Sequence, residues 1–391
     1  MPEDNKPVIG MVLTGGGARA AYQAGVIRYV SELYADSPNP ISIYTGSSAG
    51  AINVVACAAG ANRHDLASKK LWDVWVNLRH DKIFDADMPS LAWIGGRLLF
   101  DLVFGGNITR PTTRYLLNTK PLKKLLQEEI VFSAIRLNLK KGVLKGVAVS
   151  ATNYLTGTNI TFYDAKTTDD SWVRSQRVAR PAHITIDHLM ASAAIPVFFP
   201  PVQLDGSYYG DGSVRLTSPL SAAIHLGANK IIAIGIRHRL TDRSLLEINR
   251  HPMRRVYMAD IAGLLMNSVF SDSLESDIER LERVNRSLQR IPMEIRHQHP
   301  DRLRHIDLLT ITPSVDLGEL AAGQFNTFPP FLKYLLRGIG VSPDRGGELI
   351  SYLSYDSSYT AKLLELGYED ARKIKGKIES FIDGGNPPPS S

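Results

Sequence analysis

Short runs of apolar residues alternate with helical patterns along the first sixty residues. Residues 7–14 (PVIGMVLT) and Ile41–Thr45 are mainly apolar and are bounded by Pro or Gly, which predicts buried strands. Each run leads through glycines into a helix. Ala20–Leu33 has apolar residues at helical spacing, and Ala51–Ala59 consists mostly of small residues. This strand–loop–helix alternation is typical of a parallel sheet with helices on its faces.

Later segments continue the pattern and add helices. Apolar runs predict further strands at Gly146–Thr152, Ile160–Tyr163, Lys230–Ile236 and Ile306–Thr312. Residues 254–290 repeat apolar positions at helical spacing, which predicts a long amphipathic helix or a helix pair. Short helical patterns follow at Pro329–Leu336, Tyr359–Leu366 and Ala371–Ile382. We expect the final GGNPPPSS segment to be disordered.

Composition narrows the class of protein. The chain has 391 residues, 44% hydrophobic and 21% charged, which allows a packed core and excludes wholesale disorder. A net charge of +6 is too small over this length to indicate nucleic-acid binding. The single cysteine, Cys57, excludes an internal disulfide framework. No apolar run reaches the roughly 18 residues of a membrane span. Because the N-terminus is polar, we expect a cytoplasmic protein; a mature secreted chain stays open.

The pentapeptide Gly46-Ser47-Ser48-Ala49-Gly50 fits the pattern G-x-S-x-G. A nucleophilic serine requires a tight strand-to-helix turn that projects its hydroxyl, and the flanking glycines let strand and helix pass closely. The apolar segment before Ser48 and the small-residue helix after it supply that context. Ser48 is therefore the candidate nucleophile, against the alternative of a glycine-rich turn without chemistry.

The general base is harder to predict. A Ser–Asp–His triad on an α/β-hydrolase fold needs several strands before the serine, and only 47 residues precede Ser48. The candidate histidines have no distinctive local context; they include His183, His188, His225 and His238. A different partner for the serine is therefore needed.

A second glycine cluster, Gly15-Gly16-Gly17-Ala18-Arg19, follows the first predicted strand. Its bare amides suit an oxyanion or a phosphate. The spacing Gly15-x-Gly17-x-x-Ala20 also loosely matches a dinucleotide fingerprint, but the second strand lacks the acid that such a site requires. For Arg19 two interpretations stay open: a guanidinium that steadies the loop or meets a lipid phosphate, and a structural ion pair.

Asp211-Gly212-Ser213 follows the stretch ASAAIPVFFPPV. Taken alone, an Asp–Gly pair indicates only a turn, and Asp205-Gly206 nearby shows how common the pattern is. In this order, however, the glycine cluster, the serine pentapeptide and Asp211-Gly212 resemble the patatin-like phospholipases, in particular the bacterial-type lipid acyl hydrolases.

The resemblance implies a three-layer α/β/α fold with a mainly parallel central sheet. It also implies that Ser48 is the nucleophile and Asp211 the base of a catalytic dyad, with Gly15, Gly16 and Gly17 as the oxyanion hole and Arg19 beside them. No metal or cofactor is implied, and the substrate would be a phospholipid or lysophospholipid. One departure is Ser213, where many relatives have Gly or Ala.

On this basis we divide the chain into a patatin-like catalytic core at 7–220, further core strands with inserted amphipathic helices at 221–317, and a helical C-terminal extension at 318–391. The role of the C-terminal region from about residue 240 to 391 stays open: it completes the sheet, regulates, or forms a homodimer. Two other functions also stay open, namely an acyltransferase with the same dyad and a lipid-binding regulatory module with a vestigial site.

Two segments are candidates for contact with a membrane. Residues 91–104 (LAWIGGRLLFDLVF) are too short to span a bilayer and indicate either a lid or a core helix. Residues 286–305 are rich in Arg and His, which fits attraction to anionic lipid, a solvated face or, as a third alternative, metal binding by the histidines. We expect a peripheral protein in transient contact with a membrane surface and no nucleic-acid partner.

Overall fold

The computed structural model describes residues 7–85, 115–166, 172–239, 256–292, 295 and 304–384. Its centre is one sheet in the order β10-β9-β1-β2-β3-β4-β6-β5, with β8 paired to β3 and β7 to β8. The strands are β1 (Ile9–Leu13), β2 (Ile41–Ser47), β3 (Gly146–Asn153), β4 (Asn159–Ala165), β5 (Val173–Arg174), β6 (Arg177–Pro181), β7 (Val202–Leu204), β8 (Ser207–Asp211), β9 (Lys230–Ile234) and β10 (Asp307–Ile311).

Five neighbouring strands run parallel, from the edge strand β10 through β9, β1 and β2 to β3. Strand β4 is antiparallel to β3, and so is the short β8. In a parallel set every strand ends at the same edge. The loops after β1 and β2, which hold the two glycine clusters, therefore emerge side by side.

Both faces of the parallel strands are buried. Alternate residues of β1 separate onto the two faces: Met11 and Leu13 belong to one cluster of buried side chains, and Val12 belongs to another. Strand β9 repeats this division with Ile232 and Ile231. Burial on both sides explains why these strands read as continuous apolar runs in the sequence rather than as alternating ones.

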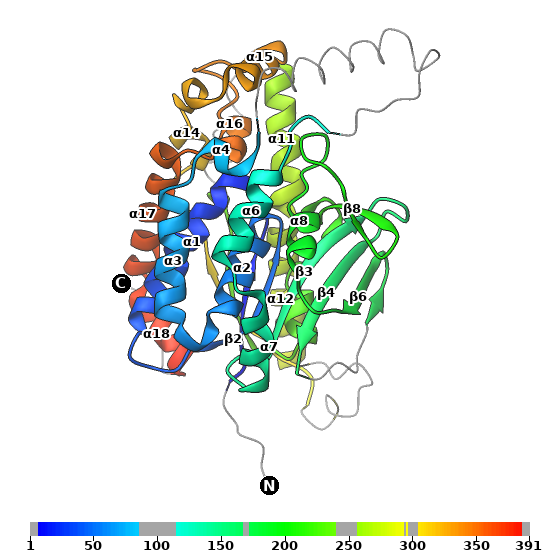
Figure 1. The fold of residues 1–391 in the computed structure, drawn as a ribbon. Coiled ribbons are helices and arrows are strands. Elements are labelled where there is room, and N and C mark those ends of the chain that lie inside the picture. Colours follow the sequence, from blue (N-terminus) through cyan, green and yellow to red (C-terminus); the bar gives the residue numbers. More distant parts are fainter. Residues whose placement is uncertain are drawn as a thin grey trace.

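Helices cover the two faces of the sheet (Figure 1). The helices of the first half are α1 (Ala20–Leu33), α2 (Ala49–Ala59), α3 (His64–Val76), α4 (His80–Ile83), α6 (Lys120–Glu129), α7 (Phe132–Lys140), α8 (Ile186–Ser192) and α9 (Ser221–His225). Those of the second half are α11 (Met258–Phe270), α12 (Asp272–Gln289), α14 (Leu317–Leu320), α15 (Pro330–Gly338), α16 (Gly347–Leu353), α17 (Ser357–Lys373) and α18 (Lys375–Asp383). Helices α1, α2, α3 and α17 contribute to one face, and α9 and α12 to the other, which gives three layers. The expected fold class is confirmed.

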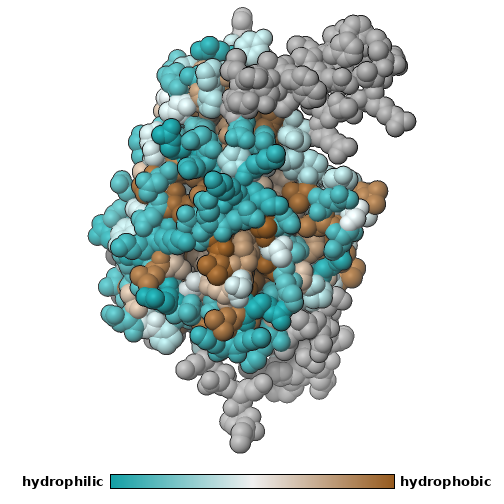
Figure 2. Space-filling view, viewed as in Figure 1, coloured by the Kyte–Doolittle hydropathy of each residue, from teal (hydrophilic) through white to brown (hydrophobic). Residues whose placement is uncertain are grey.

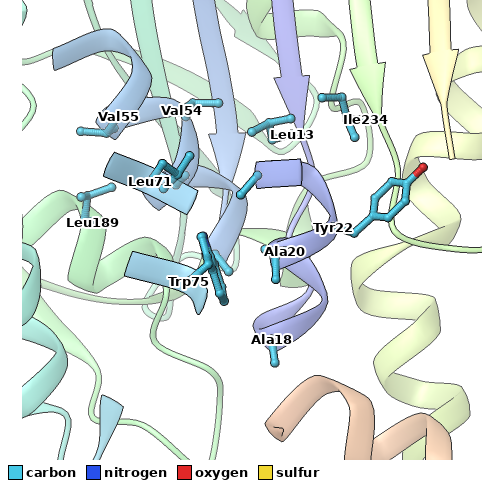
Figure 3. Close-up of a cluster of buried hydrophobic side chains, with 14 of the residues drawn as sticks. Leu13, Ala18, Ala20, Tyr22, Val54, Val55, Leu71, Trp75, Leu189 and Ile234 are labelled. Carbon is cyan, nitrogen blue, oxygen red and sulfur yellow. The ribbon is translucent and has the colours of Figure 1, made fainter. Parts of the chain in front are cut away.

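The face with α2, α3 and α6 is mostly polar, with an apolar hollow between α3 and α6 (Figure 2). Beneath it, the side chains of Leu13, Val54, Leu71 and Trp75 are buried together (Figure 3). None of the described helices has both the length and the hydrophobicity needed to span a bilayer.

Most predicted elements are confirmed to within two or three residues, and two points differ in detail. Residues 254–290 form the helix pair α11 and α12, broken at Ser271. The predicted short helices 359–366 and 371–382 instead form α17, continuous to Lys373, and then α18. Gly367 lies inside α17, where a Cβ would strike the Tyr22 backbone carbonyl of α1, so this glycine permits close helix packing. The 91–104 segment and residues 385–391 of the final tail lie outside the described residues.

Candidate active site

Ser48 lies at the sharp turn between β2 and α2. Its backbone has φ 53° and ψ −134°, a conformation that residues other than glycine rarely adopt. Both flanking glycines are needed for the turn. A Cβ on Gly46 would lie 2.8 Å from the backbone of Gly50, and one on Gly50 would lie 2.5 Å from the Thr14 carbonyl oxygen. The turn therefore has the strained geometry of a nucleophile elbow.

A serine that the sequence analysis did not single out holds this turn in position. Ser192, at the end of α8, accepts a hydrogen bond from the Ser48 N–H at 2.9 Å and donates one to the Ser150 carbonyl of β3 at 2.6 Å. Ser192 is completely buried, so water does not compete for either bond. Because the contact spans 144 positions, no local pattern could have revealed it.

Asp211, the last residue of β8, is fixed next to the end of β3. It pairs with Ala151 in the sheet, its N–H donates to the Ala194 carbonyl at 2.9 Å, and its own carbonyl accepts from Thr152 Oγ1 at 2.8 Å. The side chain also caps the short helix that follows, since Oδ1 accepts the Ser213 N–H at 2.8 Å. Asp211 is thus part of a rigid strand end rather than of a loose turn.

Burial controls the charge of this carboxyl. Asp211 is completely inaccessible to solvent, and desolvation raises its pKa from 3.8 to about 7. The Ser48 hydroxyl lies close enough to counteract part of this rise, as do the N–H and hydroxyl of Ser213. Among the described residues, no group forms a hydrogen bond of ordinary geometry with Asp211 Oδ2. One buried lone pair, beside a serine hydroxyl, is therefore free to accept a proton.

The first glycine cluster packs directly on Ser48. A Cβ on Gly15 would lie 2.6 Å from the Ser48 Cβ, so only glycine fits there. The Gly15 N–H donates to Ser47 Oγ at 3.2 Å, and that hydroxyl lies 3.0 Å from Ser213 Oγ. These three residues form a polar bridge from the glycine loop to the Asp211 turn. Ser213, the departure from the family pattern, belongs to this bridge.

The next two amides differ from that of Gly15. Within the part of the chain that the structure describes, the N–H groups of Gly16 and Gly17 have no hydrogen-bond partner. Gly17 has φ +54°, and a Cβ on it would strike the carbonyl of Tyr352. The loop therefore has two amides without a protein acceptor, directly after Gly15, which packs on Ser48; amides of this kind suit an oxyanion.

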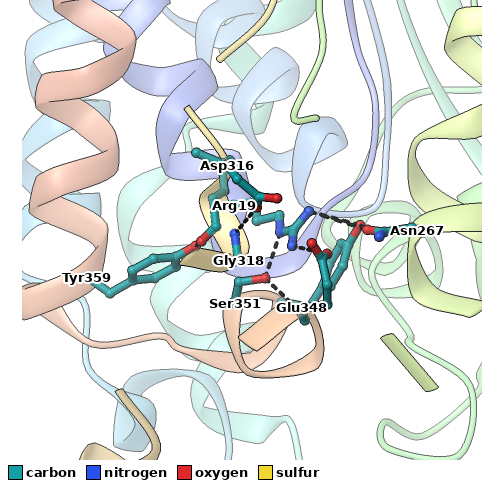
Figure 4. Close-up of polar contacts among 9 residues, drawn as sticks. Arg19, Asn267, Asp316, Gly318, Glu348, Ser351 and Tyr359 are labelled. Atoms are coloured by element: carbon teal, nitrogen blue, oxygen red, sulfur yellow. Dashed lines mark hydrogen bonds and ion pairs between the residues drawn. The ribbon is translucent and has the colours of Figure 1, made fainter. Parts of the chain in front are cut away.

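Arg19 points away from this loop into a network formed by the C-terminal region (Figure 4). Its guanidinium pairs with Glu348 at 2.6 Å, donates to Ser351 Oγ at 2.7 Å and stacks over the Tyr352 ring at 4.2 Å. Burial by itself would lower the pKa of Arg19, but Tyr352 and Glu348 outweigh that effect and raise it. The structure thus favours the structural interpretation of Arg19, which ties the glycine loop to α16.

Tyr355 also comes from the C-terminal region, and the sequence analysis missed it. It is buried, and with Ser48 it lines a narrow apolar cavity of about 50 Å³. Desolvation and the nearby Asp211 carboxyl both raise its pKa, which keeps the phenol neutral. Its hydroxyl would lie 3.1 Å from a Cβ on Gly17, so it belongs to the same small region.

The candidate histidines lie elsewhere. His183 is exposed and contacts Asp164 at 3.3 Å, and the His188 ring bonds to the Thr185 hydroxyl at the start of α8. Among the described residues, no histidine is hydrogen-bonded to Ser48 or Asp211, and no group of acidic, His or Cys side chains could hold a metal ion.

Comparison with known proteins decides the family. The model of the patatin-like phospholipases matches residues 11–224, which hold the serine elbow, the glycine loop and Asp211. This chain is a member of the patatin-like phospholipase family. No curated protein matches the sequence. Membership indicates hydrolase activity on lipid esters.

Solved structures resemble this patatin-like chain only distantly. VipD from Legionella pneumophila is 15% identical with a TM-score of 0.37, covering 97% of this chain and 67% of its own. Human GIVD cytosolic phospholipase A2, in complex with methyl γ-linolenyl fluorophosphonate, is 13% identical with a TM-score of 0.46; the match covers 98% of this chain and 60% of the human one. ExoU from Pseudomonas aeruginosa, in its complex with SpcU, is 15% identical with a TM-score of 0.30; the match covers 96% of this chain and 78% of the ExoU chain. This chain thus spans only about three fifths of the length of the human enzyme.

The match to the patatin-like family ends before the C-terminal region begins. Glu348, Ser351, Tyr352 and Tyr355 all lie beyond residue 224, yet they contact the glycine loop or line the cavity at Ser48. Residues outside the matched segment therefore complete the surroundings of the elbow.

Proposed function

We propose that this protein is a lipid acyl hydrolase that cleaves carboxylic esters of phospholipids or lysophospholipids through a Ser48–Asp211 dyad. The observation that carries the proposal is the buried Asp211 carboxyl beside the strained Ser48 elbow. One oxygen of this carboxyl accepts no hydrogen bond from the described residues, and its pKa is about 7. A carboxyl with this pKa is well suited to accept and return a proton near neutral pH.

In the first step, Ser48 Oγ attacks the ester carbonyl carbon and its proton passes to Asp211 Oδ2. Negative charge develops on the carbonyl oxygen. The Gly16 and Gly17 N–H groups, with the N-terminus of α2, are the donors for that charge, whereas Gly15 helps by its close packing and its bond to Ser47. A donor of this kind typically contributes a factor of about 10² to 10³ in rate.

The tetrahedral intermediate collapses as Asp211 returns the proton to the leaving alcohol, which leaves the acyl group on Ser48. Water then attacks the acyl-enzyme with Asp211 again as base, and the fatty acid is released. Neither metal nor cofactor is needed, because the residues named above carry every proton and charge in the cycle.

We expect the enzyme to reach its substrate by transient contact with a membrane surface. Helix α11 supports this expectation because Met258, Ile261, Leu264 and Leu265 are each roughly half to two thirds exposed along it. An apolar stripe of this kind suits insertion into the interfacial region of a bilayer. Through Asn267, 3.4 Å from Arg19, the same helix contacts the glycine loop.

The test is covalent labelling of purified protein with a fluorophosphonate, followed by mass-spectrometric analysis of the products from a mixed lipid extract. We expect labelling at Ser48 and release of fatty acid. Ser48→Ala should abolish both, and Ser42→Ala, a matched serine in the same strand, should preserve both. Full turnover in Ser48→Ala would refute the proposal.

The same experiment separates the two other functions. An acyltransferase would label at Ser48 but, with an added alcohol acceptor, would form a new ester instead of fatty acid. A regulatory module with a vestigial site would bind lipid without labelling.

A further inference from the structure

The narrow cavity at Ser48 adjoins a larger groove. The groove measures about 470 Å³ and lies between α2, α3 and α6. It shares five lining residues with the inner cavity: Ile52, Leu71, Val74, Leu125 and Leu126. The two spaces are therefore neighbours with a common wall, and the outer one coincides with the apolar hollow visible in Figure 2.

The order of the lining residues gives the groove a direction. Along α2 they run from Ala49, beside Ser48, through Ile52 and Ala56 to Gly60 at the outer end. Along α3 the order is reversed, from Trp75 inside to Arg63 outside, because this helix returns antiparallel to α2. Helix α6 runs outward again, from Leu122 to Glu129. Three helices thus define one passage that leads from the nucleophile to the surface.

The inner part of this passage is apolar. Among the described residues that line it, only Ser48, Tyr355 and Trp75 have side chains with polar atoms, and the Trp75 indole N–H is already bonded to Asn53 Oδ1 at 2.9 Å. No charged side chain of the part of the chain that the structure describes lines it. Among the described residues, charged side chains line only the outer groove, where Arg63 contributes and Lys70 of α3 pairs with Glu129 of α6 at 3.1 Å. The lining suits a hydrocarbon chain and disfavours a polar head group.

We propose that this passage binds the acyl chain of the ester and measures its length, so that long-chain esters are the preferred substrates. The inference deepens the proposed function and rests on it, because Ser48 has to carry the acyl group. From Ala49 to Gly60 the helix rises about 17 Å at ~1.5 Å per residue. An extended hydrocarbon advances roughly 1.3 Å per carbon, given carbon–carbon bonds of about 1.5 Å. About thirteen carbons therefore fill the passage before the charged mouth.

Ala56 is the residue at which this length can be changed. It lines the outer groove, is half-buried, and lies eight residues beyond Ser48. That distance corresponds to about 12 Å of helix, or roughly nine acyl carbons. Ala56→Phe would place a ring across the passage, and Ala56→Ser is the matched control that keeps the side chain small.

The test measures kcat/KM for 4-nitrophenyl esters with acyl chains of 4 to 16 carbons. For the wild type we expect kcat/KM to rise by up to about fourfold per added methylene and to level off near 12 to 14 carbons. Ala56→Phe should keep the activity on the four-carbon ester, which also shows that it folds, and lose at least about tenfold on the 12-carbon ester. Ala56→Ser should follow the wild type. An unchanged ratio of the two activities in Ala56→Phe would overturn the inference.

A binding experiment separates this inference from the proposed chemistry. Hexadecanoate binding to Ser48→Ala protein, measured by calorimetry, requires no turnover. We expect the additional Ala56→Phe substitution to weaken it by at least tenfold. If no ester is hydrolysed at all, the proposed function fails, while this binding result still decides the passage. If Ala56→Phe does not fold, Val74→Phe on α3 provides the same block.

Discussion

Replacing Asp211 by Asn should make the protein inactive and, at alkaline pH, more stable. The carboxyl is completely buried, and its pKa rises from 3.8 in a solvated chain to about 7 in the folded protein. An asparagine retains an oxygen for the Ser213 N–H and replaces the other carboxylate oxygen by a neutral NH2 group that does not titrate.

The magnitude follows from the difference between the two pKa values. Each unit corresponds to about 1.4 kcal/mol, so the ionised Asp211 lowers the free energy of unfolding by about 4 kcal/mol. Below about pH 4 both states carry the proton and there is no penalty. Between about pH 4 and pH 7 the folded state retains a proton that the unfolded chain has released, so stability falls as the pH rises. Above pH 7 the full penalty applies.

The assay is urea unfolding of the wild type and of Asp211→Asn at pH 5 and pH 8. The difference in the free energy of unfolding, variant minus wild type, should increase by about 2 to 3 kcal/mol between the two pH values, because part of the penalty already exists at pH 5. Other titrating groups cancel in this difference. Asp205→Asn is the matched control, since that carboxylate lies in an exposed turn six residues earlier.

A difference that does not change with pH would refute the reasoning, because it would mean that the protein accommodates the Asp211 charge at no cost. If Asp211→Asn instead gains stability and loses turnover, the Asp211 carboxyl serves the reaction and lowers the stability of the fold.

Three further predictions concern the surroundings of the dyad. On a short-chain ester, kcat/KM should decline below about pH 7, tenfold per pH unit, as Asp211 gains its proton; a profile flat to pH 5 would contradict its role as base. Ser192→Ala should lower the free energy of unfolding, measured by chemical denaturation, by about 1–3 kcal/mol and should lower kcat, because the Ser48 N–H loses its partner. A kcat equal to that of the wild type would show that the elbow needs no such support. Glu348→Gln should lower the melting temperature and kcat, because Arg19 is left as a buried cation without its counter-charge. Since Glu348 is one-third exposed, we expect the free energy of unfolding to fall by no more than about 2 kcal/mol. An unchanged kcat would show that α16 does not position the glycine loop.

The sequence alone determined the strands of the parallel sheet and the two glycine-bounded turns. Strands such as β1 and β9 are buried on both faces, so their apolar runs are continuous and easy to recognise. The elbow at Ser48 was equally visible, because the close passage of β2 and α2 permits only glycine at 46 and 50. Both signals are local: each residue is constrained by neighbours a few positions away in the chain.

The tertiary structure alone decided which distant side chains meet at these turns. Asp211, which only the family resemblance had paired with Ser48, lies beside it because β8 pairs with β3, whereas the similar Asp205 turn remains at the surface. Ser192, Arg19 and Tyr355 acquired their places through contacts across 144 to more than 300 positions, which leave no periodic trace in the sequence. The pKa of Asp211 is likewise a property of the packed protein, because it depends on the exclusion of water by parts of the chain that are far apart in sequence.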